Sequence, residues 1–292
     1  MLINAYKAAW GVPFELASFE QWLVEVRSKG YRGIEINIHE WPAKDITRLR
    51  DLLHATDTPV IIQLFTSWRD YIGPRPEGLG PKEHLAVYKQ QVAIAKTFKP
   101  VLINVQSGCD IWTIEQSIEF YRETLKIDAA LGLEGVVCHE THRNRSCFEL
   151  HVTSAILQAV PQLKLTGDIS HWVLVGERLL STHPEDRRLL EMVVPHIHHI
   201  HCRIGTTQSS QCAEPEHMAY TAEREFFYHF WKQVADYHRK TGDKHELTFV
   251  PEYGPFPYHP LFSPRTNSEV ADTEATKLKI LLSASVVRPF GR

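Results

Sequence analysis

Two apolar stretches, VIIQLF at residues 60–65 and VLINV at residues 101–105, indicate the fold class of this chain. Both are rich in β-branched residues and almost continuously apolar, instead of alternating between apolar and polar side chains. Strands of this composition are typical of a parallel sheet that is covered by helices on its faces. The segment between them is long enough for the crossover helix that a parallel connection needs.

The same alternation of strand and helix runs along the whole chain. Similar short stretches predict strands at residues 2–5, 33–38, 59–65, 101–105, 135–138, 163–166, 197–202 and 247–250. Segments of helical periodicity lie between them, such as the one that carries Phe19, Trp22, Leu23 and Val26. Eight such units in 292 residues average about 36 residues each. We therefore predict an α/β fold, a (β/α)8 TIM barrel, as a single domain over residues 1–292.

The residues at the expected helix ends agree with this division. Ser18 with Gln21 and Thr113 with Gln116 have the spacing of capping boxes, and Pro81 is suited to a first helical turn. Gly30, Gly132 and Gly242 fall where helices are expected to end. No GxGxxG or GxxxxGK[ST] motif supports the alternative of an open, doubly wound nucleotide-binding sheet.

Composition excludes several classes of partner. The formal net charge of -3, from 32 Lys and Arg against 35 Asp and Glu, argues against binding to nucleic acid. No apolar run reaches the roughly 20 residues that span a bilayer, and the first residues lack the pattern of a signal peptide. Five scattered cysteines without a CxxC pair favour a reducing, cytoplasmic location.

Polar residues at the ends of the last four expected strands are the strongest functional signal. Glu140, Asp168, His201 and Glu252 each follow or end one of these strands. Because the carboxyl ends of barrel strands meet at one face, these four side chains are expected to converge. Three carboxylates repel one another when they share a small space, so the pattern predicts a divalent cation between them. A single strand-end carboxylate is more often a salt-bridge partner, and only the coincidence of four favours a metal.

The motifs at these strand ends resemble the xylose isomerase-like TIM-barrel superfamily. They are HETHRNR at 139–145, GDISHW at 167–172, HIHCRIG at 199–205 and PEYGP at 251–255. The superfamily contains sugar isomerases, ketose 3-epimerases, inosose dehydratases and apurinic endonucleases. The resemblance implies one metal ion held by Glu140, Asp168, His201 and Glu252. It also implies a sugar or keto-polyol substrate, and related barrels commonly associate into homo-oligomers.

The ligand set favours Mn²⁺, with Mg²⁺, Co²⁺ or Zn²⁺ as alternatives, because carboxylates suit hard cations. By the same resemblance, Glu140 and Glu252 are expected to act as the acid and base that move a carbon-bound proton through an enediolate. Return of the proton to the same carbon gives epimerisation, and return to the neighbouring carbon gives isomerisation. Loss of a β-hydroxyl makes the protein a lyase, which is the main alternative.

Several further residues are candidates for substrate contact. The resemblance implies this role for His171 and, less directly, for Arg203, which stands in an Arg-Ile-Gly sequence where Lys-Asp is common. Trp10 and Trp172 follow expected strands and are suited to stacking on a sugar ring, although core packing is equally compatible with Trp172. Arg143 is a candidate for binding an acidic substituent. The long segments 68–81 and 203–221 are candidate substrate-covering loops.

Polar residues within the apolar strands need buried partners. They include Glu35, Asn37, Asn104 and Gln106, and for Glu35 we favour a structural ion pair. A DNA-repair nuclease of this fold needs additional histidine ligands, yet Gln63 and Gln106 stand where they are wanted. The nuclease therefore ranks below the isomerase and the lyase.

Overall fold

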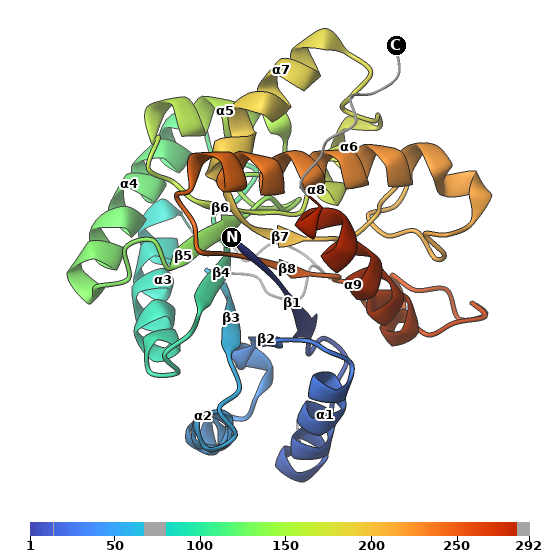
Figure 1. Cartoon of the computed structure of the whole chain (residues 1–292). Coiled ribbons are helices and arrows are strands. Elements are labelled where there is room, and N and C mark those ends of the chain that lie inside the picture. Colours follow the sequence, from blue (N-terminus) through green and yellow to red (C-terminus); the bar gives the residue numbers. More distant parts are fainter. Residues whose placement is uncertain (14, 67–79, 285–292) are drawn as a thin grey trace.

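In the computed structural model, which describes residues 1–13, 15–66 and 80–284, eight parallel strands close into a barrel (Figure 1). The strands are β1 Leu2–Ala8, β2 Gly33–Asn37, β3 Val60–Phe65, β4 Leu102–Gln106, β5 Val137–Glu140, β6 Leu165–Gly167, β7 Ile197–His201 and β8 Glu246–Val250. Each strand pairs with the next in the sequence, and β1 pairs with β8 to close the ring. The predicted (β/α)8 barrel is confirmed.

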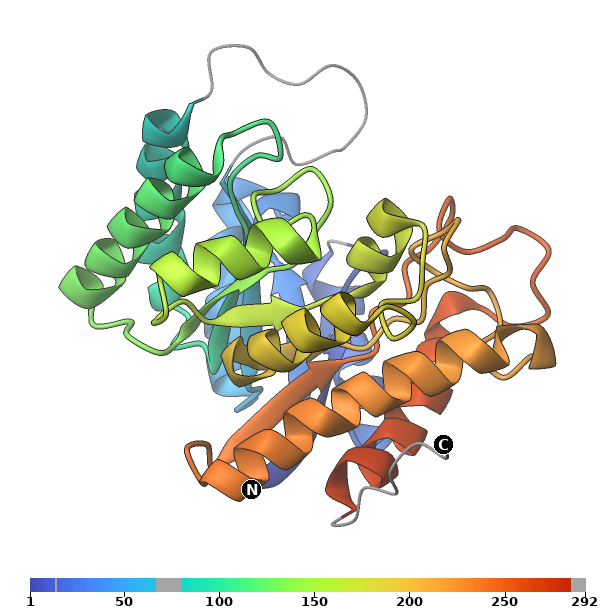
Figure 2. The ribbon, with the colours of Figure 1, turned by 90° about the horizontal axis from the view of Figure 1, so that it is seen from above.

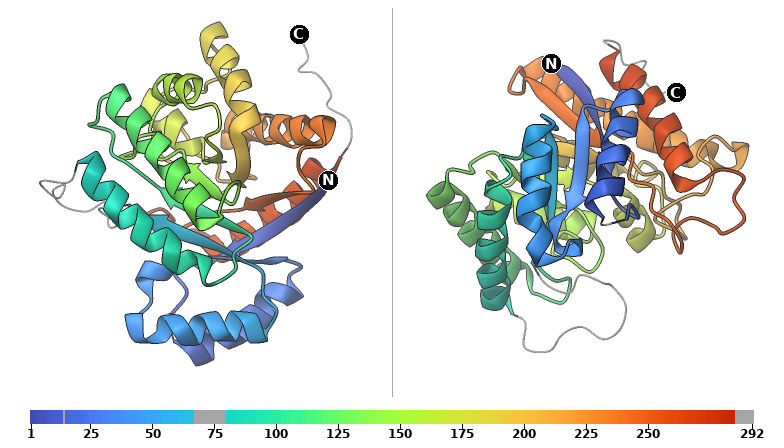
Figure 3. Two further views of the ribbon diagram at one scale, coloured as in Figure 1. Left: turned by 90° about the vertical axis from the view of Figure 1, so that its left-hand side faces the viewer. Right: turned by 90° about the horizontal axis from the view of Figure 1, so that it is seen from below.

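Helices follow the strands and cover the outside of the barrel (Figures 2 and 3). In the described residues they are α1 Leu16–Ser28, α2 Ile46–Ala55, α3 Pro81–Lys96, α4 Ile114–Leu131, α5 Leu150–Ala159, α6 Ser170–Gly176, α7 Pro184–Val193, α8 Thr221–Thr241 and α9 Asn267–Ser283. Short 3-10 turns lie at Ile38–Glu40, Ala43–Asp45, Val194–His196 and Met218–Tyr220. Both α6 and α7 follow β6, so this unit carries one helix more than the repeat requires.

The predicted strands all occur, with bounds that differ by about three residues or fewer. Thr113 and Gln116 form the expected capping box at α4, and Pro81 occupies the first turn of α3. The capping box predicted at Ser18 and Gln21 is wrong. Helix α1 begins earlier, at Leu16 after the N-cap Glu15, and the Ser18 hydroxyl donates to the Glu15 carbonyl at 2.9 Å within the first turn.

Both faces of the sheet are buried, as the apolar strands predict. In β3, Ile62 and Leu64 pack outward into the main core beneath the helices. Ile61 belongs instead to a small cluster inside the barrel, together with Tyr6, Leu102, Cys138 and Val250. The two-residue period of a strand places the next inward side chain one layer higher.

That upper layer is polar, and it creates the floor of the site. The inward positions two residues beyond the apolar layer are Ala8, Gln63, Asn104, Glu140 and Glu252. On β2 and β7 the inward residues of the same region are Glu35 and His201. The barrel is thus filled by apolar side chains below and by titratable ones at the carboxyl ends of its strands, where barrel enzymes carry their chemistry.

Of the two candidate substrate-covering loops, only the one after β7 lies wholly within the described residues. Residues 68–79 of the first candidate loop lie outside the described residues. The second loop is attached to the segment after β8, because the Gln211 amide donates to the Gly254 carbonyl at 3.1 Å and accepts from the Gly254 N–H at 2.8 Å. In the described part of the chain, no helix has the combined length and apolar character that crossing a membrane requires.

Candidate functional site

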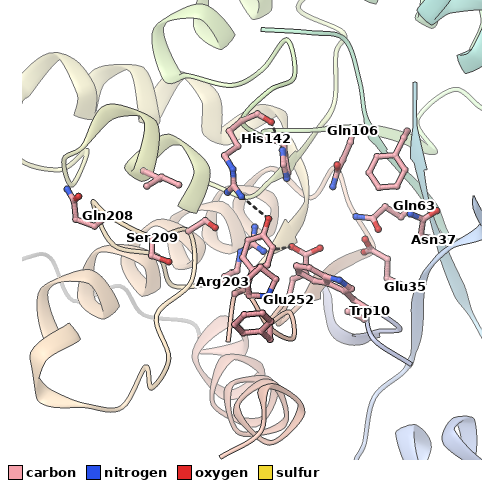
Figure 4. A pocket seen from close by; sticks show the side chains of 18 residues that line it. Trp10, Glu35, Asn37, Gln63, Gln106, His142, Arg203, Gln208, Ser209 and Glu252 are labelled. Carbon is pink, nitrogen blue, oxygen red and sulfur yellow. Dashed lines mark hydrogen bonds and ion pairs between the residues drawn. The ribbon is translucent and has the colours of Figure 1, made fainter. Parts of the chain in front are cut away.

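A cavity of about 610 Å³ opens at the carboxyl ends of the strands (Figure 4). Five polar or charged residues that line it are Glu35, Gln63, Arg143, Arg203 and Glu252. The remaining lining residues, polar and apolar, are Ala8, Trp10, Asn37, Phe65, Gln106, His142, Leu174, Gln208, Ser209, Ser210, Phe256, Pro257 and Tyr258. Figure 4 shows Gln208 and Ser209 at one end of this cavity and Glu35, Asn37 and Gln63 at the other, with Glu252 and Arg203 between them.

The structure brings the four expected metal ligands together. One donor atom from each of Glu140, Asp168, His201 and Glu252 lies within 4.8 Å of the donor atoms of the other three. All four side chains are buried, with Glu252 the most exposed at 7 %. Glu140 ends β5, Asp168 directly follows β6, His201 ends β7 and Glu252 lies two residues beyond β8. Residues that are far apart in the sequence therefore meet because β5 to β8 are consecutive strands of the barrel.

Two atoms at the centre of this quartet are buried and have no hydrogen-bond partner among the described residues. They are His201 Nδ1 and Glu140 Oε1, which lie 3.6 Å apart. Glu252 Oε2 is 3.3 Å from the same His201 nitrogen. A buried polar atom without a partner is unfavourable, and a bound cation would satisfy both atoms at once. The donor set of three carboxylates and one imidazole therefore fits a divalent metal ion.

Arg203 and a protonated His201 can offset the charge of the three carboxylates that they contact. Burial opposes a charge on His201, but the carboxylates of Glu252, Glu35 and Glu140 raise its pKa well above the ordinary value. Burial raises the pKa of Asp168 to about 6, and the nearby Arg203 guanidinium limits the rise. A cation at this point would take the place of the His201 proton, because a ligating imidazole must release it.

Glu35 fixes the orientation of His201. Its carboxylate accepts hydrogen bonds from His201 Nε2 at 2.9 Å and from His199 Nε2 at 3.0 Å. His199 Nε2 carries a proton because the Glu35 carboxylate only accepts, and its Nδ1 lies 2.7 Å from the Thr248 hydroxyl and 3.1 Å from the Thr248 carbonyl. The ion-pair role favoured for Glu35 agrees with these contacts. With Nε2 committed to Glu35, His201 presents Nδ1 to the quartet.

Arg203 lies against the carboxylates of the quartet. Its guanidinium is 2 % exposed, donates to Asp168 Oδ2, and lies 3.3 Å from Glu252 Oε2. Burial favours the neutral form of Glu252, but His201 and Arg203 lower the pKa of this carboxyl below its usual range. Arg203, which stands where Lys-Asp is common, is therefore part of the site.

His171 joins Arg203 to Arg143. The Arg203 Nη2 is 2.8 Å from His171 Nε2, and the Arg143 Nη1 is 3.0 Å from His171 Nδ1. The His142 ring packs on His171 with 3.7 Å between centroids. Burial lowers the pKa of His171 well below its ordinary value, and His142 and the two arginines lower it further. His171 is thus a neutral imidazole between two guanidinium groups.

The two tryptophans have different places. Trp10 lines the cavity and makes an edge contact with the Tyr258 ring at 5.0 Å between centroids. Trp172 is 1 % exposed, does not line the cavity, and donates its indole N–H to the Cys147 carbonyl at 3.0 Å. Trp172 therefore packs in the core and does not stack on a ligand in the cavity, because α6 turns its side chain toward the helix layer.

Two further groups of potential ligands share members with the quartet. They are Glu35, His199 and His201, and Glu140, His142 and His171. In the first group both carboxylate oxygens already accept N–H groups of the histidines. In the second, His142 Nδ1 is 2.6 Å from the Arg143 carbonyl, so that nitrogen carries its proton, and His171 lies between two cations. The quartet is better suited to a cation than either.

Comparison with known proteins identifies the fold. No protein family model matches the chain, and no curated protein matches it. Among solved structures, an L-ribulose 3-epimerase has a TM-score of 0.61 at 14% identity, covering 99% of this chain and 100% of that one. An IOLI protein with bound zinc has a TM-score of 0.60 at 14% identity, with coverage of 97% and 98%. A probable 3-DHS dehydratase, AsbF from Bacillus anthracis, has a TM-score of 0.54 at 14% identity, with coverage of 94% and 98%.

These similarities place the chain in a structural class. Its barrel is similar to those of a xylose isomerase domain protein and an L-ribulose 3-epimerase, in agreement with the fold expected from the strand-end motifs. Solved structures of similar fold include epimerases and a probable dehydratase. At these identities the likeness extends to the fold, so the chemistry of this chain is argued from its own residues.

The different placement of the two tryptophans predicts different costs of replacement. Trp172→Ala is expected to lower the free energy of unfolding by about 3–5 kcal/mol, because it leaves a large cavity in the core. Trp10→Ala is expected to cost clearly less, since its ring is partly exposed to the cavity. Chemical denaturation of both variants measures the difference, and equal losses would contradict the assignment.

Proposed function

We propose that this chain is a divalent-metal-dependent isomerase or epimerase that acts on a sugar or a related keto-polyol. The observation that carries the proposal is the convergence of Glu140, Asp168, His201 and Glu252 on two buried atoms without hydrogen-bond partners, beside a cavity. The partner is a small molecule rather than nucleic acid or a membrane. The five cysteines are free, which agrees with a reducing cytoplasm, and association into a homo-oligomer belongs to the same proposal.

The four residues would hold the metal ion, for which Mn²⁺ is our first choice and Mg²⁺, Co²⁺ and Zn²⁺ are alternatives. Zinc gains some support because the IOLI protein of the same fold binds it. When bound, such an ion stabilises negative charge that develops on adjacent substrate oxygens as a carbon-bound proton leaves. Glu140 Oε2 accepts from the Asn104 amide at 2.8 Å, which leaves its other oxygen for the ion.

Glu252 and Glu140 are assigned the proton transfers. Glu252 lines the cavity, so its carboxylate is placed to remove a proton from bound substrate. Glu140 lies deeper, next to the same His201 nitrogen, and is assigned the opposite transfer. Arg203 is assigned to orient substrate hydroxyls, and Trp10 to pack against the sugar ring. His171, expected from the sequence to touch substrate, does not line the cavity and is assigned to hold Arg203 and Arg143 in place.

A lyase with the same site is the second candidate. The probable dehydratase among the solved structures of this fold favours it, since loss of a β-hydroxyl can follow the same proton removal. A screen of ketoses, inososes and 3-keto-glycosides in deuterated water, followed by NMR, separates the two. Deuterium at one carbon without loss of water supports the isomerase or epimerase, and release of water supports the lyase.

A nuclease is the least favoured reaction. The cavity positions where a multinuclear cluster needs histidines hold Gln63 and Gln106, and the chain carries a net charge of -3. A substrate with a phosphodiester backbone is therefore not expected.

Replacing both proton-transfer residues tests the metal and the reaction together. The protein as purified with Mn²⁺ and dialysed is expected to hold about one ion per chain, and Glu140→Gln with Glu252→Gln to hold much less, because two anionic ligands are lost. Elemental analysis gives the stoichiometry. Unchanged metal content together with unchanged turnover in the double variant would refute the proposal.

The orientation of His201 by Glu35 predicts a second effect. Glu35→Gln is expected to weaken Mn²⁺ binding by about 10–100-fold, because the carboxylate that holds the His201 N–H is lost. Isothermal titration calorimetry measures the dissociation constant. Glu246→Gln, the same substitution on β8 at the opposite end of the barrel, is the matched control and should leave it unchanged. Wild-type affinity in Glu35→Gln would limit Glu35 to a structural ion pair.

A further inference from the structure

One arginine of the cavity, Arg143, has no anionic partner within the described part of the chain. Arg143 follows β5, is half-buried, and lines the cavity. Its guanidinium donates to the Tyr258 hydroxyl at 2.7 Å and lies 3.0 Å from His171 Nδ1. Among the described residues, no carboxylate lies within ion-pair distance of it. A guanidinium has five N–H donors, so most of those on Arg143 remain available to a ligand.

Arg203, unlike Arg143, has carboxylate partners. Its charge is compensated by Asp168 and Glu252, which belong to the proposed metal site. The two arginines share neighbours, because their Cζ atoms lie 5.5 Å and 5.6 Å from the centre of the Tyr258 ring. They also share His171, one at each ring nitrogen. Arg143 is therefore displaced from the carboxylates by the width of an imidazole ring.

The His171 imidazole cannot accept a hydrogen bond from both Arg143 and Arg203. A neutral histidine has one nitrogen that accepts and one that carries a proton, so either Arg143 or Arg203 faces an N–H instead of a lone pair. Arg203 has the two carboxylates to accept its remaining donors, whereas Arg143 has the Tyr258 hydroxyl. The charge of Arg143, half-buried beside the cavity and not offset by a carboxylate of the described residues, attracts an anion.

We propose that Arg143, with Tyr258 beside it, binds an anionic oxygen-bearing group of the substrate, a carboxylate or a phosphate. This inference rests on the proposed function, because it places the hydroxy-ketone of the substrate at the quartet and its charged end at Arg143. The substrate class is then an acidic ketose instead of a neutral sugar. A planar guanidinium binds either group through two parallel hydrogen bonds, which a lysine in its place does not provide.

Three ketoses that differ at one carbon test the inference. D-fructose, D-fructuronate and D-fructose 6-phosphate carry a hydroxyl, a carboxylate and a phosphate at the same end. Their dissociation constants are measured by calorimetry on the Mn²⁺-loaded protein and on the metal-free protein. At least one of the two anionic ketoses is expected to bind about tenfold more tightly than D-fructose or better, and the stronger one identifies the group.

Variants assign that preference to Arg143. Arg143→Met is expected to abolish the preference while binding of D-fructose changes little, and Arg143→Lys to restore part of it. Tyr258→Phe keeps the ring and the arginine charge and should keep most of the preference. Arg48→Met, on the exposed face of α2, is the matched control for loss of one positive charge.

Three results would overturn the inference: equal binding of all three ketoses, no binding of either anionic ketose at millimolar concentration, or a preference that survives in Arg143→Met. Thermal unfolding of each variant separates misfolding from loss of the contact. The preference is measured without metal as well as with it. Failure of metal binding or of proton exchange therefore contradicts the proposed function, and loss of the preference contradicts the role of Arg143.

Discussion

The mutual repulsion of buried carboxylates around His201 is the constraint on which the rest of the site depends. Glu140, Asp168 and Glu252 are held at the carboxyl ends of neighbouring strands, where the barrel leaves them little exposure to water. Arg203 and a protonated His201 contact these carboxylates and can offset part of the repulsion. A divalent cation at the same point relieves the repulsion directly and satisfies the two atoms that lack partners.

The surrounding residues follow from that constraint. Glu35 turns the correct nitrogen of His201 toward the quartet, and Asn104 donates to the outer oxygen of Glu140. The apolar layer beneath, with Ile61 and Val250 among its members, closes the barrel below the charges. In the cavity above them, Glu252 lies beside Arg203, and Arg143 lies across His171 from Arg203.

Much of this arrangement was predictable from the sequence, because it depends on strand order and a two-residue period. The apolar, β-branched composition of segments such as VIIQLF predicts strands. A parallel barrel then places Glu140, Asp168, His201 and Glu252 at one face. Contacts that depend on side-chain direction were not predictable. Trp172 turns into the core, Ser18 lies inside a helix that starts earlier, and Tyr258 comes from a loop with no periodic pattern. The sequence marked Arg143 as a candidate, but not that it lacks an anionic partner.

The central claim is that one divalent ion binds among four residues of β5 to β8 and the segments that follow them. Anomalous diffraction from a crystal of the protein soaked in Mn²⁺ tests it most directly. The account predicts one strong peak within about 2.0–2.3 Å of an atom from each of Glu140, Asp168, His201 and Glu252. A crystal without a peak at this position, or with the ion held by Glu35 and His199 or by His142 and His171, would contradict it.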